Sequence, residues 1–123
     1  PHLDKFNSSR LKIADSYFQK IINKKIQIRK FENDGSYIAH LFTIEVVDAS
    51  QRNALMSYLN ENQIGSDIHY PIPDYKQNPI KKEFDTVHLE NTEERCSKLL
   101  TIPCYPELEI EKVNFIIEKL NKW

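Results

Sequence analysis

The residues best suited to chemistry lie together in the segment Ile68–Gln77. A histidine, two tyrosines, a lysine and an amide side chain follow the end of a predicted strand there, and Pro71 and Pro73 stiffen the backbone between them. Hydrogen-bonding groups and a positive charge held in a fixed geometry suit a polyhydroxylated or phosphorylated ligand. The residues alone leave one alternative open, a proline-rich connector whose histidine and tyrosines bond only to local backbone groups.

His40 and the two cysteines carry weaker chemical signals. His40 lies among apolar neighbours in the best predicted strand, where a histidine is more often a satisfied sheet residue than a ligand or a base. None of the four histidines is spaced three or four residues from another metal ligand on a predicted helix, so no metal site is expected. Cys96 and Cys104 have no adjacent base, and we interpret both as buried thiols. No catalytic residue is therefore predicted within this chain.

Length, charge and hydropathy exclude several classes of protein. The 123 residues suffice for one domain with one core. Lys and Arg number 17 against 18 Asp and Glu, which gives no electrostatic reason to bind nucleic acid or an anionic membrane. No apolar run approaches the roughly 20 residues of a bilayer-spanning helix, and no signal-peptide pattern stands at the front. We therefore expect a soluble, cytoplasmic protein.

Glycine is scarce in this chain. Gly35 and Gly65 are the only two glycines, against about 7% in average proteins. Loops that bind phosphate use glycine or other small residues, so that backbone N–H groups can approach the anion. The sequence contains no such loop, and any cofactor phosphate must therefore be bound elsewhere.

The hydrophobic periodicity predicts an α+β fold with helices on one face of a small antiparallel sheet. Alternating or β-branched runs predict about three strands, at residues 24–31, 37–47 and 66–70. Spacings of three and four residues predict four helices. The first covers residues 3–23, the second follows a cap at Asp48 or Ser50, and the third runs from Asn91 to about Leu99. The fourth contains the apolar stripe Ile110, Val113, Ile116, Ile117 and Leu120. Asn91 and Glu94 are spaced as a capping box, and residues 71–90 are expected to form a long surface loop.

The first helix has two apolar stripes, which predicts that it is covered on more than one side. It is either a core helix of this domain or a connector whose leading half packs on another domain. We favour the connector, with residues 1–24 leading from a large domain and residues 25–123 forming the domain proper.

Four blocks of sequence, taken in order, cover almost the whole chain and resemble one known family. They are Leu3–Tyr17, Tyr37–Ile44 with its His-Leu-aromatic core, Leu59–Gln77 with its His-Tyr-Pro signature, and Leu99–Leu108 with its Tyr-Pro-Glu-Leu ending. Together they resemble the C-terminal portion of the DegT/DnrJ/EryC1/StrS aminotransferases, which aminate nucleotide-linked keto sugars. The sequence of His69–Pro73, together with Lys76 and Gln77, is most similar to the corresponding sequence of members that make 3-amino-3,6-dideoxyhexoses on dTDP.

The resemblance implies a fold and a cofactor. The chain would be the small C-terminal domain of a fold type I enzyme of the aspartate-aminotransferase kind, which depends on pyridoxal 5′-phosphate. In such an enzyme the large domain supplies the Schiff-base lysine and most of the phosphate site. The family's glycine-rich segment around that lysine has no counterpart in this chain. The 123-residue chain alone is therefore expected to be inactive and to contribute no cofactor-binding residue.

The resemblance also implies a substrate, partners and site residues. The parent enzyme would move an amino group, from glutamate as the expected donor, to a dTDP-linked keto-6-deoxysugar in deoxysugar or cell-surface polysaccharide biosynthesis, and would act as a homodimer. His69, Tyr70, Lys76 and Gln77 would border the nucleotide-sugar pocket, with His40 close to it. The alternative is a free-standing, non-catalytic binding or interaction module that reuses the same fold.

Overall fold

The computed structural model describes residues 2–29, 35–77, 82, 84 and 86–123. The elements in chain order are α1 (Leu3–Lys20), β1 (Phe42–Glu45), α2 (Ala49–Glu61), the 3₁₀ helix η1 (Asp74–Lys76), α3 (Glu90–Lys98), β2 (Leu99–Ile102) and α4 (Ile110–Lys122). Within the described residues, the α+β class and the four predicted α-helices are confirmed.

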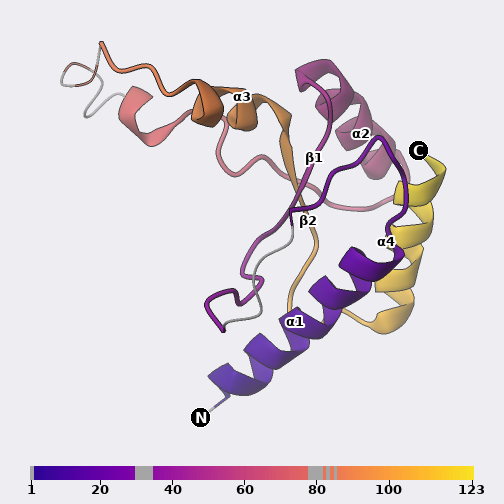
Figure 1. Ribbon diagram of the computed structural model, residues 1–123. Helices are drawn as coiled ribbons and strands as arrows, with labels where there is room; N and C mark the ends of the chain where they lie inside the picture. Colours follow the sequence, from indigo (N-terminus) through magenta and orange to yellow (C-terminus); the bar gives the residue numbers. More distant parts are fainter. Residues whose placement is uncertain (1, 30–34, 78–81, 83, 85) are drawn as a thin grey trace.

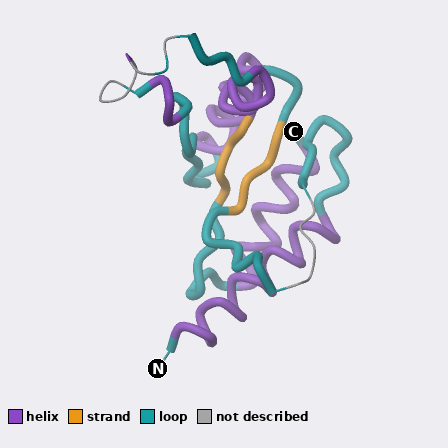
Figure 2. Tube along the Cα trace, turned by 60° about the vertical axis from the view of Figure 1, so that its left-hand side comes forward, coloured by secondary structure: helices purple, strands orange, loops and turns teal. Residues whose placement is uncertain are grey.

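The two strands cross the middle of the molecule, and the helices lie around them (Figure 1). α1 and α4 pack side by side, while α2 contacts both β2 and α3. η1 and α3 lie beyond one end of the sheet, far from the start of α1, in both views (Figures 1 and 2). None of the helices in the described part of the chain is both long and apolar enough to span a membrane.

The sheet has two strands, and the expectation of three was wrong. β1 and β2 pair in antiparallel register, with Phe42 opposite Ile102 and Ile44 opposite Leu100. Two of the segments expected as strands contribute single bridges instead, Gln27 to Glu45 and Asp67 to Thr101. Residues 30 and 31 of the first expected strand lie outside the described residues.

The two observed strands also differ from the prediction. β1 is shorter than the predicted strand at residues 37–47, because Ala39 has a φ of 49° and a left-handed residue cannot continue an extended strand. β2 was not predicted at all, since Leu99 follows α3 directly and the sequence contains no turn signal between them. A short apolar run beside a helix cannot be distinguished from the last turn of that helix by periodicity alone.

The helix ends are determined by particular side chains. Asp48 caps α2 by accepting a 2.8 Å hydrogen bond from the Gln51 N–H, so one of the two predicted caps is confirmed. The predicted capping box of α3 is wrong, because the helix begins at Glu90 after Leu89, with no side-chain cap. Glu94 forms an ion pair with Lys98 one turn further along the helix instead.

The side chain of Asn121 ends α1 and ties it to α4. Its Oδ1 accepts hydrogen bonds from the N–H groups of Ile22 at 2.8 Å and Asn23 at 3.3 Å, and its Nδ2 donates to the Lys20 carbonyl at 2.9 Å. Asn23 returns a 2.8 Å hydrogen bond to the Leu120 carbonyl. These bonds satisfy groups that a helix end otherwise leaves unpaired, so α1 stops at Lys20 rather than near the expected Asn23.

One core joins the buried face of the sheet to the helices. Phe42, Ile44, Leu100 and Ile102 are each 2% exposed or less. They pack with the buried residues of α1, α2 and α4, which are Ile13, Ala14, Tyr17, Leu55, Leu59, Val113, Ile116, Ile117 and Leu120. Ile110, expected in the same stripe of α4, is 52% exposed because it stands at the first residue of the helix.

Tyr17 connects α1 to both strands of the sheet. Its ring is fully buried and lies 4.9 Å from the ring of Phe42, centroid to centroid. Its hydroxyl group donates a 2.7 Å hydrogen bond to the carbonyl of Pro103, directly after β2. Burial raises the pKa of the Tyr17 hydroxyl well above its ordinary value, so it acts as a neutral donor at every physiological pH.

We predict that Tyr17→Phe lowers the free energy of unfolding of this chain by about 1 kcal/mol, because the Pro103 carbonyl loses its donor while the ring remains packed. Urea denaturation followed by circular dichroism would measure the change. Tyr105→Phe is the control, since Tyr105 is 46% exposed and water can replace its hydroxyl contacts. Equal stability of the two variants would contradict the prediction.

Candidate functional site

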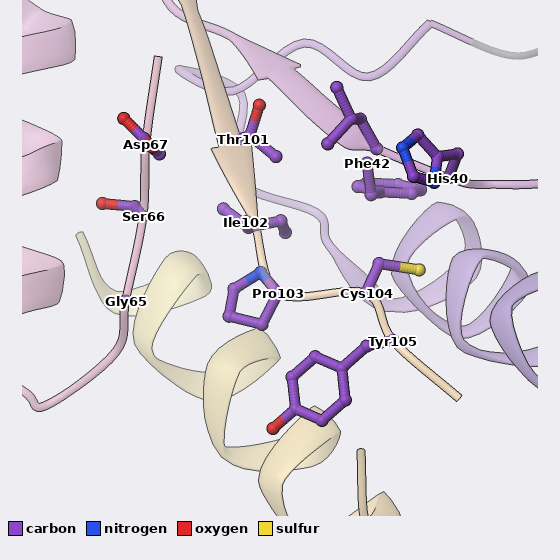
Figure 3. Close-up of a pocket in the computed structure, with 11 residues that line it drawn as sticks. His40, Phe42, Gly65, Ser66, Asp67, Thr101, Ile102, Pro103, Cys104 and Tyr105 are labelled. Atoms are coloured by element: carbon purple, nitrogen blue, oxygen red, sulfur yellow. The ribbon is translucent and has the colours of Figure 1, made fainter. Parts of the chain in front are cut away.

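The sheet and two segments beside it surround an open hollow of about 350 Å³. β2 lies between β1 and the segment that contains Asp67, so the hollow receives residues from three neighbouring stretches of chain. Figure 3 shows Ser66 and Asp67 on one side of β2 and His40 on the other. The lining residues are His40, Leu41, Phe42, Gly65, Ser66, Asp67, Thr101, Ile102, Pro103, Cys104 and Tyr105.

His40 reaches the edge of the hollow because of the turn that precedes it. Ala39 is fully buried and has positive φ, so the chain changes direction there and leaves His40 exposed just before β1. The residue before the turn is held by α1, since the Arg10 Nε donates a 3.4 Å hydrogen bond to the Ile38 carbonyl. The sequence predicted His40 inside the strand, but the structure places it two residues before β1.

His69 lies beside the hollow and is attached to β2 through Thr101. The backbone of Asp67 pairs with that of Thr101 through N–H···O bonds of 3.1 and 2.7 Å. The His69 Nδ1 lies 3.0 Å from the Thr101 Oγ1, and its Nε2 lies 3.8 Å from an Asp67 carboxylate oxygen. The contact with Thr101 uses Nδ1, so Nε2, which lies beyond hydrogen-bond distance of the Asp67 carboxylate, is the ring nitrogen that a ligand could reach.

Lys76 belongs to a second cluster, centred on Glu93 at the start of α3. The Lys76 Nζ lies 2.6 Å from Glu93 Oε2, and the Tyr75 hydroxyl group donates a 2.6 Å hydrogen bond to Glu93 Oε1. The His88 Nδ1 lies 3.0 Å from the same Oε1. The hydrogen bonds from Lys76 and then Tyr75 hold the pKa of the Glu93 carboxyl at about 2, below its ordinary 4.5, and the same contact with Glu93 raises the pKa of Lys76.

The structure therefore divides the residues predicted for the site. His40 lines the hollow, and His69 is joined to the hollow residue Thr101. Tyr70 is 62% exposed, and its ring meets the edge of the His69 ring at 5.5 Å. Lys76 and the exposed Gln77, which ends η1, are not among the residues that line the hollow.

Several residues of both clusters were missed by the sequence analysis. Glu93 gave no signal, because its role depends on two adjacent residues of η1, 17 and 18 positions earlier in the chain, folding back against it. Thr101 and Tyr105 stand inside a block that resembles the family, and the pattern of that block was the one signal that could have identified them. Asp67 precedes the chemical cluster by one residue and was assigned to the strand.

Cys104 is a buried lining residue of the hollow. Its thiol lies 3.6 Å from the Arg10 carbonyl, to which it donates, and it is 9% exposed. Burial raises the pKa of the thiol from its ordinary 9.0 to about 11, so it is protonated and unreactive at neutral pH. The buried-thiol interpretation is confirmed for Cys104, whereas Cys96 is half-buried.

Comparison with known proteins identifies the family of this chain. Residues 1–121 match the profile of the DegT/DnrJ/EryC1/StrS aminotransferase family. The chain belongs to that family. A dTDP-3-amino-3,6-dideoxy-α-D-galactopyranose transaminase of Aneurinibacillus thermoaerophilus is 31% identical over 122 residues, which is 99% of this chain and 32% of that protein. A UDP-N-acetyl-3-dehydro-α-D-glucosamine 3-aminotransferase of Acidithiobacillus ferrooxidans is 28% identical over 92% of this chain and 30% of that protein.

Solved aminotransferase structures share this fold. DesV of S. venezuelae, in complex with a ketimine intermediate, superposes with a TM-score of 0.82 at 26% identity, over 99% of this chain and 33% of that one. An enzyme of Bacillus subtilis with bound PMP gives a TM-score of 0.81 at 28% identity, over 94% of this chain and 27% of that one. The chain thus shares its fold with about a third of each of these aminotransferases, and it spans about a third of the length of the curated relatives it matches.

The hollow of this DegT/DnrJ/EryC1/StrS chain does not fit a pyridoxal phosphate site. The lining of the hollow includes neither lysine nor arginine, so it offers no amine for a Schiff base and no cation for a phosphate. A Cβ atom added at Gly35 or Gly65 would meet no atom within 4 Å, so close packing within this chain requires glycine at neither position. Among the described residues, no group of three or more His, Cys, Asp and Glu side chains could hold a metal ion.

We predict that iodoacetamide at pH 8 modifies Cys104 at least about tenfold more slowly than Cys96, because the raised pKa leaves little thiolate and burial restricts access. Peptide mapping by mass spectrometry would give both rates from one sample. The rate at Cys104 should rise as the pH approaches 11, and in urea the two rates should converge. Equal rates in the folded protein would contradict the assigned burial.

Proposed function

We propose that this chain is the C-terminal part of a pyridoxal-phosphate-dependent aminotransferase that aminates a nucleotide-linked keto sugar. The observation that carries the proposal is the family match over residues 1–121, and the coverage of about a third of each relative supports a longer parent protein. The cofactor and its lysine would be supplied by the rest of that protein, in keeping with a hollow that holds no lysine. When bound, the cofactor supplies the electron sink for transamination.

The proposed substrate is a dTDP-linked keto-6-deoxysugar. The His-Tyr-Pro motif within His69–Pro73 supports this choice, as does the name of the A. thermoaerophilus relative. Other relatives carry names with UDP-linked sugars or with 3-oxo-glucose-6-phosphate, so the family as a whole varies in the group attached to the sugar. Glutamate as the donor, a homodimer, a cytoplasmic location and a role in deoxysugar or polysaccharide biosynthesis are part of the same proposal.

His40, His69, Tyr70, Lys76 and Gln77 are proposed to contact the nucleotide sugar. The imidazole groups and the exposed Tyr70 hydroxyl suit sugar hydroxyl groups, and Gln77 offers an amide. Lys76 is 38% exposed at its side chain and uses one of three ammonium donors on Glu93. Two donors are left for a phosphate, so the ion pair does not prevent Lys76 from binding an anion.

Residues 1–24 are proposed to connect the large domain to the small domain. The second half of α1 is part of the core, through Ile13, Ala14 and Tyr17, whereas Leu3 and Phe6 near its start are 66% and 39% exposed. A helix buried along one half and apolar but exposed along the other supports a second packing partner for that half. The large domain of the same protein is the proposed partner.

We predict that His69→Ala or Lys76→Ala in the full-length protein lowers kcat/KM for the sugar nucleotide by about tenfold or more, because each removes one ligand hydrogen bond. The absorbance of bound pyridoxal phosphate should be unchanged. Lys122→Ala is the control, since Lys122 lies neither in the hollow nor in the Glu93 cluster and pairs with Glu118 of its own helix. Unchanged kinetics in both site variants would reject the assignment.

We also predict that the 123-residue chain alone does not bind pyridoxal phosphate covalently. Borohydride reduction followed by mass spectrometry should add no pyridoxyl group, whereas the full-length protein should gain one. The same experiment separates the proposed enzyme from a non-catalytic binding module, which would gain no pyridoxyl group even as the full-length protein. A yellow, reducible adduct on the isolated chain would refute the proposed division of the site.

A further inference from the structure

The segment of residues 67–77 is attached at both of its ends to the continuous stretch that forms α3 and β2. At one end, Asp67 and His69 bond to Thr101 in β2. At the other end, Tyr75 and Lys76 bond to Glu93 in α3. The two stretches run in opposite directions, so the exposed Tyr70 and Pro71 lie between two fixed attachments.

The attachment at Glu93 is built from several contacts to one carboxylate. Glu93 Oε2 receives Lys76, and Oε1 receives the Tyr75 hydroxyl group and His88. The Tyr75 oxygen in turn accepts a 3.3 Å hydrogen bond from the Leu89 N–H at the start of α3. Both carboxylate oxygens are thus occupied, which restricts the Glu93 side chain to one orientation.

Glu94 provides an internal comparison on the same turn of α3. Its side chain is 55% exposed and pairs with Lys98 of its own helix, whereas the Glu93 side chain is 25% exposed and pairs with residues of η1. The contact of Glu94 stays within one helix, and the contacts of Glu93 join two segments. Among the residues that the structure describes, the charged and titratable groups around Glu93 are Lys76 and Tyr75 from η1, His88 before α3, and Glu90 and Glu94 from α3.

We propose that Glu93 is a positioning residue for nucleotide-sugar binding, which acts by holding Lys76 and the 67–77 segment in their binding orientation. The inference rests on the proposed function, in which Lys76, His69 and Tyr70 contact the substrate. A free lysine side chain has four rotatable bonds, and fixing it before the ligand arrives removes part of the entropy cost of binding. Glu93 supplies that fixation at Lys76, and through Tyr75 it holds η1 against α3.

This role differs from a purely structural one in a measurable way. A residue that only stabilised the fold would affect folding and leave the affinity of the folded enzyme unchanged. A positioning residue raises KM while the chemical step, carried out by groups elsewhere, keeps its rate. Its effect is also coupled to that of Lys76, because each variant removes the same interaction.

The test compares Glu93→Gln with Glu94→Gln in the full-length enzyme, together with Lys76→Met and the double variant. Glutamine preserves the size of the side chain and removes its charge. We expect Glu93→Gln to raise KM for a dTDP-linked 3-keto-6-deoxyhexose by about tenfold with kcat changed less than about twofold, while Glu94→Gln changes neither. The effects of Glu93→Gln and Lys76→Met should be less than additive in the double variant. Additive effects, or a KM equal to that of Glu94→Gln, would overturn the inference.

Hydrogen exchange gives a second readout that needs no substrate. The amides of Lys76 and Gln77 bond within η1 to the carbonyls of Pro73 and Asp74, and their exchange should be faster by about tenfold in Glu93→Gln and unchanged in Glu94→Gln. If the wild-type enzyme aminates no nucleotide sugar, the proposed function fails, and this comparison alone decides whether Glu93 holds the segment. Equal exchange in the two variants would show that it does not.

Discussion

The buried face of a two-stranded sheet is the constraint on which the remaining structure depends. Two paired strands alone are only marginally stable in water, so the apolar residues Phe42, Ile44, Leu100 and Ile102 need helices to cover them. Tyr17 in α1 meets this need, because it packs on Phe42 and bonds to the carbonyl that follows β2. The strand on which the hollow is built is therefore held by a helix from the other end of the chain.

β2 connects the core to both the hollow and the Glu93 cluster. Its one buried polar residue, Thr101, binds the backbone of Asp67 and the ring of His69, and the residues directly after it line the hollow. α3 runs into β2 without a loop, so Glu93 has a fixed place relative to Thr101. The segment of residues 67–77 therefore has a fixed position relative to the core, although most of its own side chains are exposed.

The sequence predicted the helices better than the sheet, for physical reasons. α4 and α2 repeat apolar residues at helical spacing, and that local pattern needs no knowledge of distant contacts. The pairing of Leu99–Ile102 with Phe42–Glu45 depends on residues more than fifty positions apart, and nothing in the local pattern of β2 indicates it. The same limit applies to the site: the tight cluster at residues 68–77 was visible, but the contacts of Lys76 with Glu93 and of His69 with Thr101 were not.

The shape of the hollow bears on how the proposed enzyme would bind its substrate. Ligand sites bury most of the surface of a small ligand, and a hollow open to solvent, as here, covers only one side of it. Its polar groups are histidine, hydroxyl and carboxylate side chains, which suit sugar hydroxyl groups, whereas Lys76 is held by Glu93 in a separate cluster. Under the proposed function, this domain supplies one wall of the pocket, with several hydrogen-bonding groups but neither lysine nor arginine. The opposite wall must then supply both the cofactor and the exclusion of water, because transamination requires a dry site and a lysine that this wall lacks.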